Sequence, residues 1–275
     1  METRKFGQTG LTVPIIGMGT WKTFNVKGAE AESHRQEIVK TAFDSEANFF
    51  DSSPMYGEAE RVLGAAVQKL GLRDKVMIAT KVWTDSDEAS TRQFENAFSF
   101  FGGYVDFYQV HNLVAWQKRL KTLEGFKAEG KVRAIGITHY SHSAFAELEQ
   151  IMKTGRVEGI QIPYNALERE VEKRLLPLAA ELNIGVVIMR PFGEGSLVQT
   201  SPPAKELAYF EQFGVNSWPQ ILLKWVASDP RVSVIIPATS RPERMAENAA
   251  AGNGPWFDPE SRERVSYLVR RMKDL

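Results

Sequence analysis

Short apolar runs, each closed by a polar residue, recur at a nearly constant interval along the 275-residue chain. Three of these runs are ANFFD, VMIATK and FYQVH, which end in Asp51, Lys81 and His111 at intervals of 30 residues. A strand, a helix and their two connecting loops occupy roughly 25 to 30 residues, so the period is typical of a repeated strand–helix unit. We therefore expect the three polar side chains at equivalent ends of successive parallel strands.

Eight segments of the chain are candidates for such strands. Their residues are almost continuously apolar, which favours parallel strands covered by helices over exposed antiparallel ones. The predicted strands are 13–19, 47–51, 76–81, 105–111, 132–138, 159–163, 184–189 and 232–237. Amphipathic helical patterns separate them. The sequence thus predicts an α/β fold, a (β/α)8 TIM barrel that forms one domain over residues 1–275.

Three segments fall outside the repeated unit. The run RKFGQTGLTV, residues 4–13, is typical of an N-terminal β-hairpin, and residues 257–275 predict a terminal helix. The long interval between Met189 and Val232 has room for a Gly-rich loop and an extra helix before the helix expected at 216–228. We expect the barrel to carry this hairpin and extra helices near the C-terminus.

Composition limits the partners of the chain. Lys plus Arg equals Asp plus Glu at 34 each, so no global charge favours nucleic acid or an anionic membrane. The absence of cysteine excludes disulfides and thiolate chemistry. No apolar targeting segment opens the chain, and no run of about 18 apolar residues follows. We expect a cytoplasmic protein with a small-molecule substrate, no nucleic-acid or membrane partner, and no assignable protein partner.

The polar residues at the strand ends have types that suit proton transfer. Tyr56 follows Asp51 closely, in the loop SSPMYGE. A free phenol titrates near ~10, and a neighbouring lysine ammonium is expected to lower that pKa while a carboxylate orients the lysine. An imidazole such as that of His111 can donate a hydrogen bond to a carbonyl oxygen. The set suits reversible proton delivery to a carbonyl, with the electrons supplied by a cofactor.

Other chemistries lack their sequence patterns. The four histidines include one close pair, with no thiolate and no HExxH motif, so no metal site is predicted. GxSxG is absent, which argues against a serine hydrolase of that kind. Glycoside cleavage requires a second carboxylate at a strand end, and only Asp51 is placed so.

The motifs FFDSSPMYGEAE, TKVW, QVHN, IQIPYN and VIIPATSRPERMAEN occur together in the order found in aldo-keto reductases, which the chain resembles over nearly its whole length. The resemblance implies a barrel that binds a nicotinamide dinucleotide without a Rossmann domain and reduces aldehydes or ketones to alcohols. It implies that Tyr56 is the general acid, that Lys81 and Asp51 tune it, and that His111 positions the carbonyl.

The resemblance also implies where the cofactor binds. Residues that match the family's contacts to the nicotinamide half and the pyrophosphate are Gly19, Thr20, Trp21, Asp51, Thr138, His139, Gln161, Pro191, Phe192, Gly193, Gly195 and Ser196. Met189 and Arg190 stand where many relatives have an aromatic residue and a serine. His139 stands where they have asparagine.

The adenosine end is implied by the last loop. The matching residues there are Pro237, Thr239, Arg241, Arg244, Glu247 and Asn248. Ala238 replaces a lysine used by many relatives, and Arg241 is close enough in sequence to compensate. Because a phosphate dianion prefers guanidinium partners, NADPH is the expected cofactor, with NADH as an alternative.

The substrate wall is expected to be apolar. Its predicted residues are Trp21, Phe24, Met55 and Trp83, together with His111. A wall of this composition suits aldehydes and ketones with hydrophobic bodies but does not identify a particular substrate. Two alternatives stay open at this stage. One is a regulatory subunit that binds NADP(H), senses redox state and turns over little, and the other is a sugar- or phosphate-binding barrel with hydrolytic chemistry.

Overall fold

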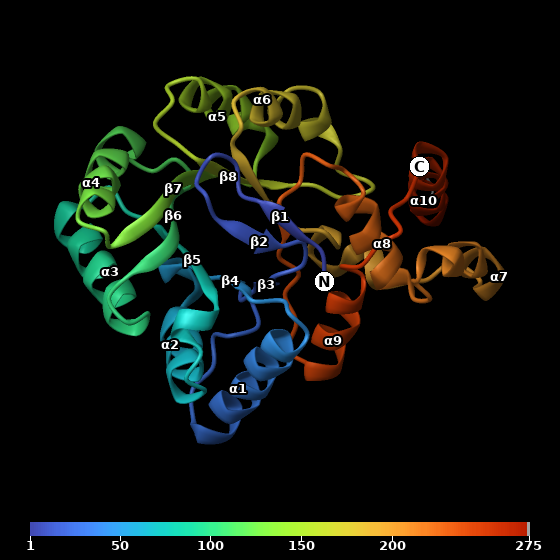
Figure 1. Cartoon of the computed structure of the whole chain (residues 1–275), viewed down its shortest axis with the longest axis horizontal. Coiled ribbons are helices and arrows are strands. Elements are labelled where there is room, and N and C mark those ends of the chain that lie inside the picture. Colours follow the sequence, from blue (N-terminus) through green and yellow to red (C-terminus); the bar gives the residue numbers. More distant parts are fainter. Residues whose placement is uncertain (274–275) are drawn as a thin grey trace.

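The computed structural model describes residues 1–273 and consists of a ring of parallel strands surrounded by helices (Figure 1). The eight-stranded sheet has the order β10-β9-β8-β7-β6-β5-β4-β3, and parallel bridges between residues 16 and 235 and between 19 and 238 close it. Its strands are β3 Met18–Gly19, β4 Phe49–Asp51, β5 Met77–Val82, β6 Val105–His111, β7 Val132–Thr138, β8 Gly159–Pro163, β9 Gly185–Met189 and β10 Val234–Ile235. The predicted (β/α)8 barrel is confirmed.

One helix follows each strand and covers the outside of the ring. These helices are α1 Ala29–Asp44, α2 Ala59–Lys69, α3 Asp87–Phe100, α4 Trp116–Ala128, α5 Phe145–Met152, α6 Leu175–Glu181, α8 Trp218–Ala227 and α9 Pro242–Ala250. Local sequence explains their ends: Ser217 caps α8 by accepting a hydrogen bond from the backbone of Gln220, and Gly71, just past α2, has a φ of +63°.

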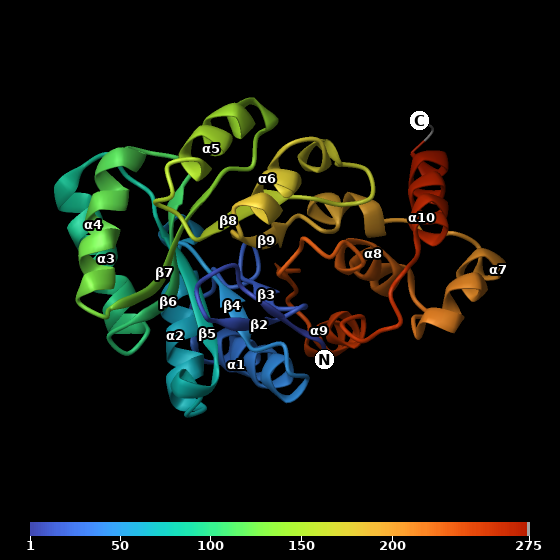
Figure 2. The ribbon, with the colours of Figure 1, turned by 45° about the horizontal axis from the view of Figure 1, so that its top comes forward.

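Two further helices lie to one side of the barrel, as Figure 2 shows. They are α7 Ala204–Leu207 and α10 Pro259–Met272, and Asp258 caps α10 through the backbone N–H of Ser261. The extra helices predicted near the C-terminus are confirmed. Residues 274–275 of the predicted terminal helix lie outside the described residues.

The N-terminal hairpin crosses one end of the barrel (Figure 1). Its strands are β1 Thr3–Lys5 and β2 Thr12–Pro14, paired antiparallel. The single strand predicted at 13–19 was wrong, because this apolar run serves two sheets. Val13 packs inside the barrel end, whereas Met18 belongs to the ring and packs in the surrounding core. An uninterrupted apolar pattern does not show where a chain changes its pairing partner.

An apolar plug fills that end of the barrel. Phe6, from the hairpin loop, packs edge-to-face on Phe107 with ring centroids 4.9 Å apart. The rings occupy space left by glycines: a Cβ on Gly136 would lie 2.4 Å from the Phe107 ring, and one on Gly185 would lie 2.6 Å from Phe6. Each buried phenylalanine contributes about 1.5 to 3 kcal/mol. The polar residues Asp51, Lys81 and His111 lie at or next to the carboxyl ends of their strands.

Within residues 1–273, none of the helices combines the length and the apolar character that crossing a membrane requires.

Candidate active site

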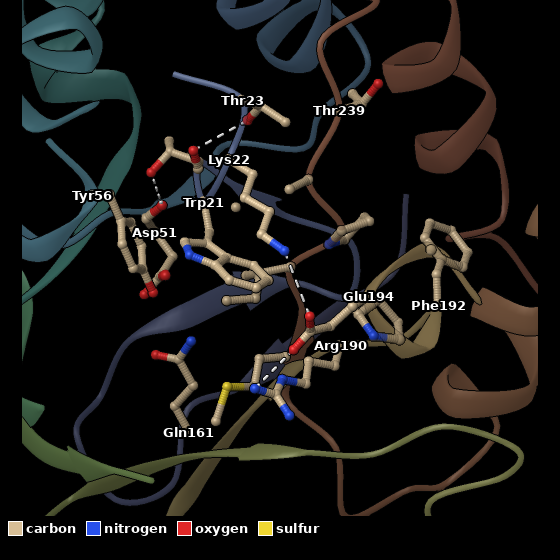
Figure 3. Close-up of a pocket in the computed structure, with 18 of the residues that line it drawn as sticks. Trp21, Lys22, Thr23, Asp51, Tyr56, Gln161, Arg190, Phe192, Glu194 and Thr239 are labelled. Atoms are coloured by element: carbon tan, nitrogen blue, oxygen red, sulfur yellow. Dashed lines mark hydrogen bonds and ion pairs between the residues drawn. The ribbon is translucent and has the colours of Figure 1, made fainter. Parts of the chain in front are cut away.

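The carboxyl ends of three neighbouring strands bring the predicted catalytic residues together. Asp51 ends β4, Lys81 lies near the end of β5, and His111 ends β6. Tyr56 comes from a single turn of 3-10 helix, Pro54–Tyr56, directly after β4. Proline at the first position of this turn needs no backbone donor, so the turn forms readily there. The structure brings the four side chains together in the wall of one cavity, and Figure 3 shows two of them, Asp51 and Tyr56, side by side.

Asp51 and Lys81 form a buried ion pair. The ammonium donates to Asp51 Oδ1 at 2.9 Å, to Oδ2 at 2.7 Å and to the carbonyl of Ser52 at 2.7 Å. Burial raises the pKa of Asp51, and the Lys81 ammonium opposes that rise. Burial acts to lower the pKa of Lys81, but Asp51 and Tyr56 outweigh it and hold that pKa above its ordinary value. Lys81 is therefore a fixed positive charge in the cavity floor.

Tyr56 lies against this charge. The Lys81 ammonium is 5.2 Å from the centre of the Tyr56 ring. Burial raises the pKa of Tyr56, and Lys81 lowers it by less, so the net shift is upward. The ammonium lowers the phenol pKa as expected, but burial outweighs it, and sequence alone does not reveal how far the ring is desolvated. The phenol consequently holds its proton throughout the neutral range, as a general acid requires.

His111 faces Tyr56 from the next strand. The two rings are nearly perpendicular, with centroids 6.0 Å apart. Burial, followed by the charge of Lys81, lowers the pKa of His111 to about 2. The imidazole is therefore neutral and can serve as a hydrogen-bond donor but not as an acid. Its Nδ1 lies 2.9 Å from Ser53 Oγ.

These residues lie at one end of a cavity of about 760 Å³. It lies within the range typical of ligand pockets. The predicted cofactor and substrate residues that line it, beside the catalytic four, are Gly19, Thr20, Trp21, Met55, Thr138, Gln161, Met189, Arg190, Pro191, Phe192, Gly195, Pro237, Thr239, Arg244, Glu247 and Asn248. They come from the ends of strands, from the loops that follow them and from α9. The cavity thus joins the catalytic end to the last loop of the chain.

Six of the predicted residues are not part of the cavity wall. Phe24 is fully buried in the apolar core. Trp83 is 41% exposed and lies outside the wall. His139 accepts a hydrogen bond from the backbone of Ser141 and stacks on Tyr140. Gly193, Ser196 and Arg241 belong to the surrounding loop and helix start.

Several wall residues were missed by the sequence argument. They are Lys22, Thr23, Asn112, Tyr140, Glu194, Val198, Pro219, Ile236 and Ala238. Glu194 pairs with Arg190 at 2.9 Å and with Lys22 at 3.6 Å, and Figure 3 shows this chain of charges across the pocket. Glu194 lies inside the predicted loop RPFGEGSL, so its position in that motif was the available signal.

Two features of the cavity fit a nicotinamide dinucleotide. Gln161 is buried, and its Oε1 has no hydrogen-bond partner among the described residues, so it can accept from a carboxamide. Figure 3 shows Trp21, Tyr56 and Gln161 pointing into one shared space. At the far end, Arg244 makes no ion pair within residues 1–273 and is available to a phosphate. Within the same residues, no group of three or more His, Cys, Asp or Glu side chains is placed to hold a metal.

Comparison with known proteins assigns this barrel to a class of oxidoreductases. The model of the Aldo/keto reductase family matches residues 15–269, and the chain belongs to this family. Among curated relatives, aldo-keto reductase YhdN of Bacillus subtilis is 28% identical over 214 residues, which cover 72% of this chain and 64% of that protein. The NADH-specific methylglyoxal reductase of Escherichia coli is 24% identical over 334 residues, covering 98% of this chain and 100% of that protein.

Solved structures agree with this assignment. An aldo-keto reductase from Klebsiella pneumoniae, solved in complex with NADPH, superposes with a TM-score of 0.80. It is 25% identical, and the match covers 98% of this chain and 94% of that one. The aldo-keto reductase AKR11C1 from Bacillus halodurans, at 20% identity and a TM-score of 0.79, has the same fold.

Proposed function

We propose that this protein reduces aldehydes or ketones to alcohols with hydride from NADPH, and that Tyr56 delivers the proton to the carbonyl oxygen. The observation that carries the proposal is the buried Asp51–Lys81 pair beside the Tyr56 ring, at one end of a cavity of about 760 Å³. A buried ion pair adds little net stability to the fold, because the free energy lost in removing both charges from water is about as large as their attraction. A fixed positive charge does stabilise the phenolate that forms when a neighbouring phenol gives up its proton.

The chain's residues supply the acid and the orientation. A bound dihydronicotinamide supplies the hydride. The neutral His111 donates a hydrogen bond to the carbonyl oxygen, which fixes the oxygen beside the phenol. Tyr56 transfers its proton as negative charge develops on that oxygen, and Lys81 stabilises the phenolate that remains. Asp51 keeps Lys81 charged and in place. The same groups run in reverse for alcohol oxidation.

The cofactor contacts follow from the cavity wall. Gln161, Thr138 and Met189 line the cavity; the first two would hold the carboxamide, and the polarisable thioether of Met189 would pack on the flat nicotinamide ring. At the other end, Arg244 is the cation proposed for the 2′-phosphate. Arg244 has no ion partner among residues 1–273, which supports NADPH over NADH. One Escherichia coli relative is named for NADH, so both dinucleotides are included in the test below.

The substrate class is that of small carbonyl compounds with an apolar body. Trp21, Met55 and Tyr140 line the cavity, and Met55 and Tyr140 are partly exposed to solvent. Two Escherichia coli relatives are named methylglyoxal reductases, which makes methylglyoxal a suitable member of a test panel.

The proposal is tested by following the absorbance of reduced nicotinamide while the protein meets a panel of aldehydes, ketones and methylglyoxal with each dinucleotide. We expect oxidation of NADPH with at least one class of carbonyl, and slower oxidation of NADH. Tight NADPH binding without turnover on any carbonyl would instead support the redox-sensing regulatory subunit. Absence of any dinucleotide binding would overturn both.

A further inference from the structure

Ser53 is a buried hydroxyl at the edge of the catalytic group, and neither the sequence argument nor the proposed mechanism uses it. It is fully shielded from solvent and sits between Asp51 and Tyr56 in the chain. Its Oγ has two polar neighbours: the backbone N–H of Met55 at 3.3 Å and His111 Nδ1 at 2.9 Å. The first contact caps the 3-10 turn that carries Tyr56. The second reaches a different strand.

The protons of this contact can be assigned by counting donors. A serine hydroxyl has one O–H to donate, and a neutral imidazole has one N–H donor and one acceptor nitrogen. Met55 N–H is a donor, so it uses a lone pair of Ser53 and leaves the hydroxyl proton free. Within the described residues, His111 Nδ1 is the one acceptor in hydrogen-bonding contact with that hydroxyl. If His111 Nδ1–H instead donated to Ser53 Oγ, the buried hydroxyl proton of Ser53 would have no acceptor, at a cost of about 1 to 3 kcal/mol.

We propose that Ser53 is a positioning residue that donates to His111 Nδ1 and thereby holds the proton of the imidazole on Nε2. The inference rests on the proposed function, in which His111 donates a hydrogen bond to the substrate carbonyl. His111 lines the cavity, and the structure gives its Nε2 no hydrogen-bond partner among residues 1–273. With the proton on Nε2, the ring presents a donor to the cavity, whereas the other tautomer would present a lone pair that repels a carbonyl oxygen.

The tautomer matters because His111 stays neutral. A cationic imidazole would carry protons on both nitrogens and would donate in either case. Burial and the charge of Lys81 keep the pKa of His111 far below the neutral range, so the partner of Nδ1 decides which nitrogen carries the proton. Control of a catalytic histidine by the hydrogen bond on its other nitrogen is a general device.

A nuclear magnetic resonance experiment tests the proposal without depending on turnover. Two-bond correlations between ring nitrogens and ring protons distinguish the two neutral tautomers in protein labelled with ¹⁵N-histidine and saturated with NADP+. The chain has only four histidines, and loss of one signal set in His111→Gln assigns the ring. We expect the Nε2–H form in the wild-type protein, and a mixture or the opposite form in Ser53→Ala. An Nδ1–H form in the wild type, or an unchanged Nε2–H form in Ser53→Ala, would overturn the proposal.

Kinetics give the second measurement. Removing a direct donor to a developing oxyanion costs roughly 10²- to 10³-fold in kcat, so we expect Ser53→Ala to lose roughly 10- to 100-fold by loosening that donor. NADPH affinity should stay unchanged, because Ser53 does not line the cavity. Ser53→Thr keeps the hydroxyl and should restore both the Nε2–H form and most of the lost kcat. Equal kcat in Ser53→Ala and the wild type would contradict the positioning role of Ser53. If the wild type has the Nε2–H tautomer but reduces no carbonyl, the proposed function fails and the proposal for Ser53 stands.

Discussion

Lys81 donates hydrogen bonds to both carboxylate oxygens of Asp51, at 2.9 and 2.7 Å, and each side chain is at most 2% exposed. Neither group has access to bulk water, so each is the counter-charge of the other. The pair lies directly under the proposed acid. Loss of either charge is therefore expected to lower the stability of the fold as well as the proposed activity.

Removing only one member of this pair should be strongly destabilising. Lys81→Met leaves a buried carboxylate without its counter-charge, and we expect a loss of about 3 to 5 kcal/mol in the free energy of unfolding. The double variant Asp51→Asn, Lys81→Met should recover most of that loss. Urea unfolding of the wild type, both single variants and the double variant measures the coupling. Strictly additive losses would show that the two charges do not depend on each other.

Glu60 gives a pH dependence of stability. It lies in the first turn of α2, accepts a hydrogen bond from Thr80 Oγ1 at 2.5 Å, and burial raises its pKa to about 7. Between the ordinary carboxyl pKa of 4.5 and about 7 the folded state binds more protons than the unfolded state, so stability falls as pH rises through this window. A shift of that size corresponds to about 3 kcal/mol.

The measurement is the difference in unfolding free energy between Glu60→Gln and the wild type from pH 4.5 to 8. The amide keeps an acceptor for Thr80 and cannot ionise. We expect the variant to gain stability relative to the wild type as pH rises, with the gain levelling off above pH 7. Parallel curves for the two proteins would show that the Glu60 carboxyl titrates normally.

Arg244 should distinguish the two dinucleotides. It lines the far end of the cavity and has no ion partner among the described residues. Arg244→Ala should weaken NADPH binding by about tenfold, the effect of losing one charge-assisted contact, and leave NADH binding nearly unchanged. Arg241→Ala is the matched control, because Arg241 is near in sequence but outside the cavity wall. Fluorescence titration with each dinucleotide provides the dissociation constants, and equal weakening of both would remove Arg244 from 2′-phosphate recognition.

Two glycines should respond in opposite directions to alanine. A Cβ on Gly136 would lie 2.4 Å from the Phe107 ring and 2.5 Å from a backbone oxygen, so Gly136→Ala should cost about 1 to 3 kcal/mol. Gly125 lies inside α4 with open space around it, and Gly125→Ala should add about 0.5 to 1 kcal/mol. Thermal unfolding measures both changes. A harmless Gly136→Ala would contradict the tightly packed barrel plug.

The common location of the polar strand-end residues could be predicted from sequence, because an apolar run closed by a polar residue indicates where a parallel strand ends. Asp51 and His111 end their strands and Lys81 is one residue from the end of its strand, so the three residues share one rim of the barrel. The direction of the Tyr56 pKa shift could not be predicted, since it depends on how much protein covers the ring. The split of residues 13–19 between two sheets, and the burial of Phe24, depend on tertiary packing in the same way.

The contact between Ser53 and His111 shows the same limit at finer scale. The two residues are 58 positions apart, and Ser53 belongs to an irregular loop with no periodic pattern. Its hydroxyl caps the 3-10 turn Pro54–Tyr56 by accepting a hydrogen bond from the backbone N–H of Met55. Only the folded arrangement shows that the same oxygen reaches the imidazole.

Turnover by Tyr56→Phe tests the central claim most directly. The substitution removes one hydroxyl and keeps the ring that packs against Lys81 and His111. With NADPH and the best carbonyl of the panel, we expect kcat to fall roughly 10²- to 10⁴-fold while the dissociation constant for NADPH stays as in the wild type. Carbonyl reduction at the wild-type rate by Tyr56→Phe would contradict the assignment of Tyr56 as the acid.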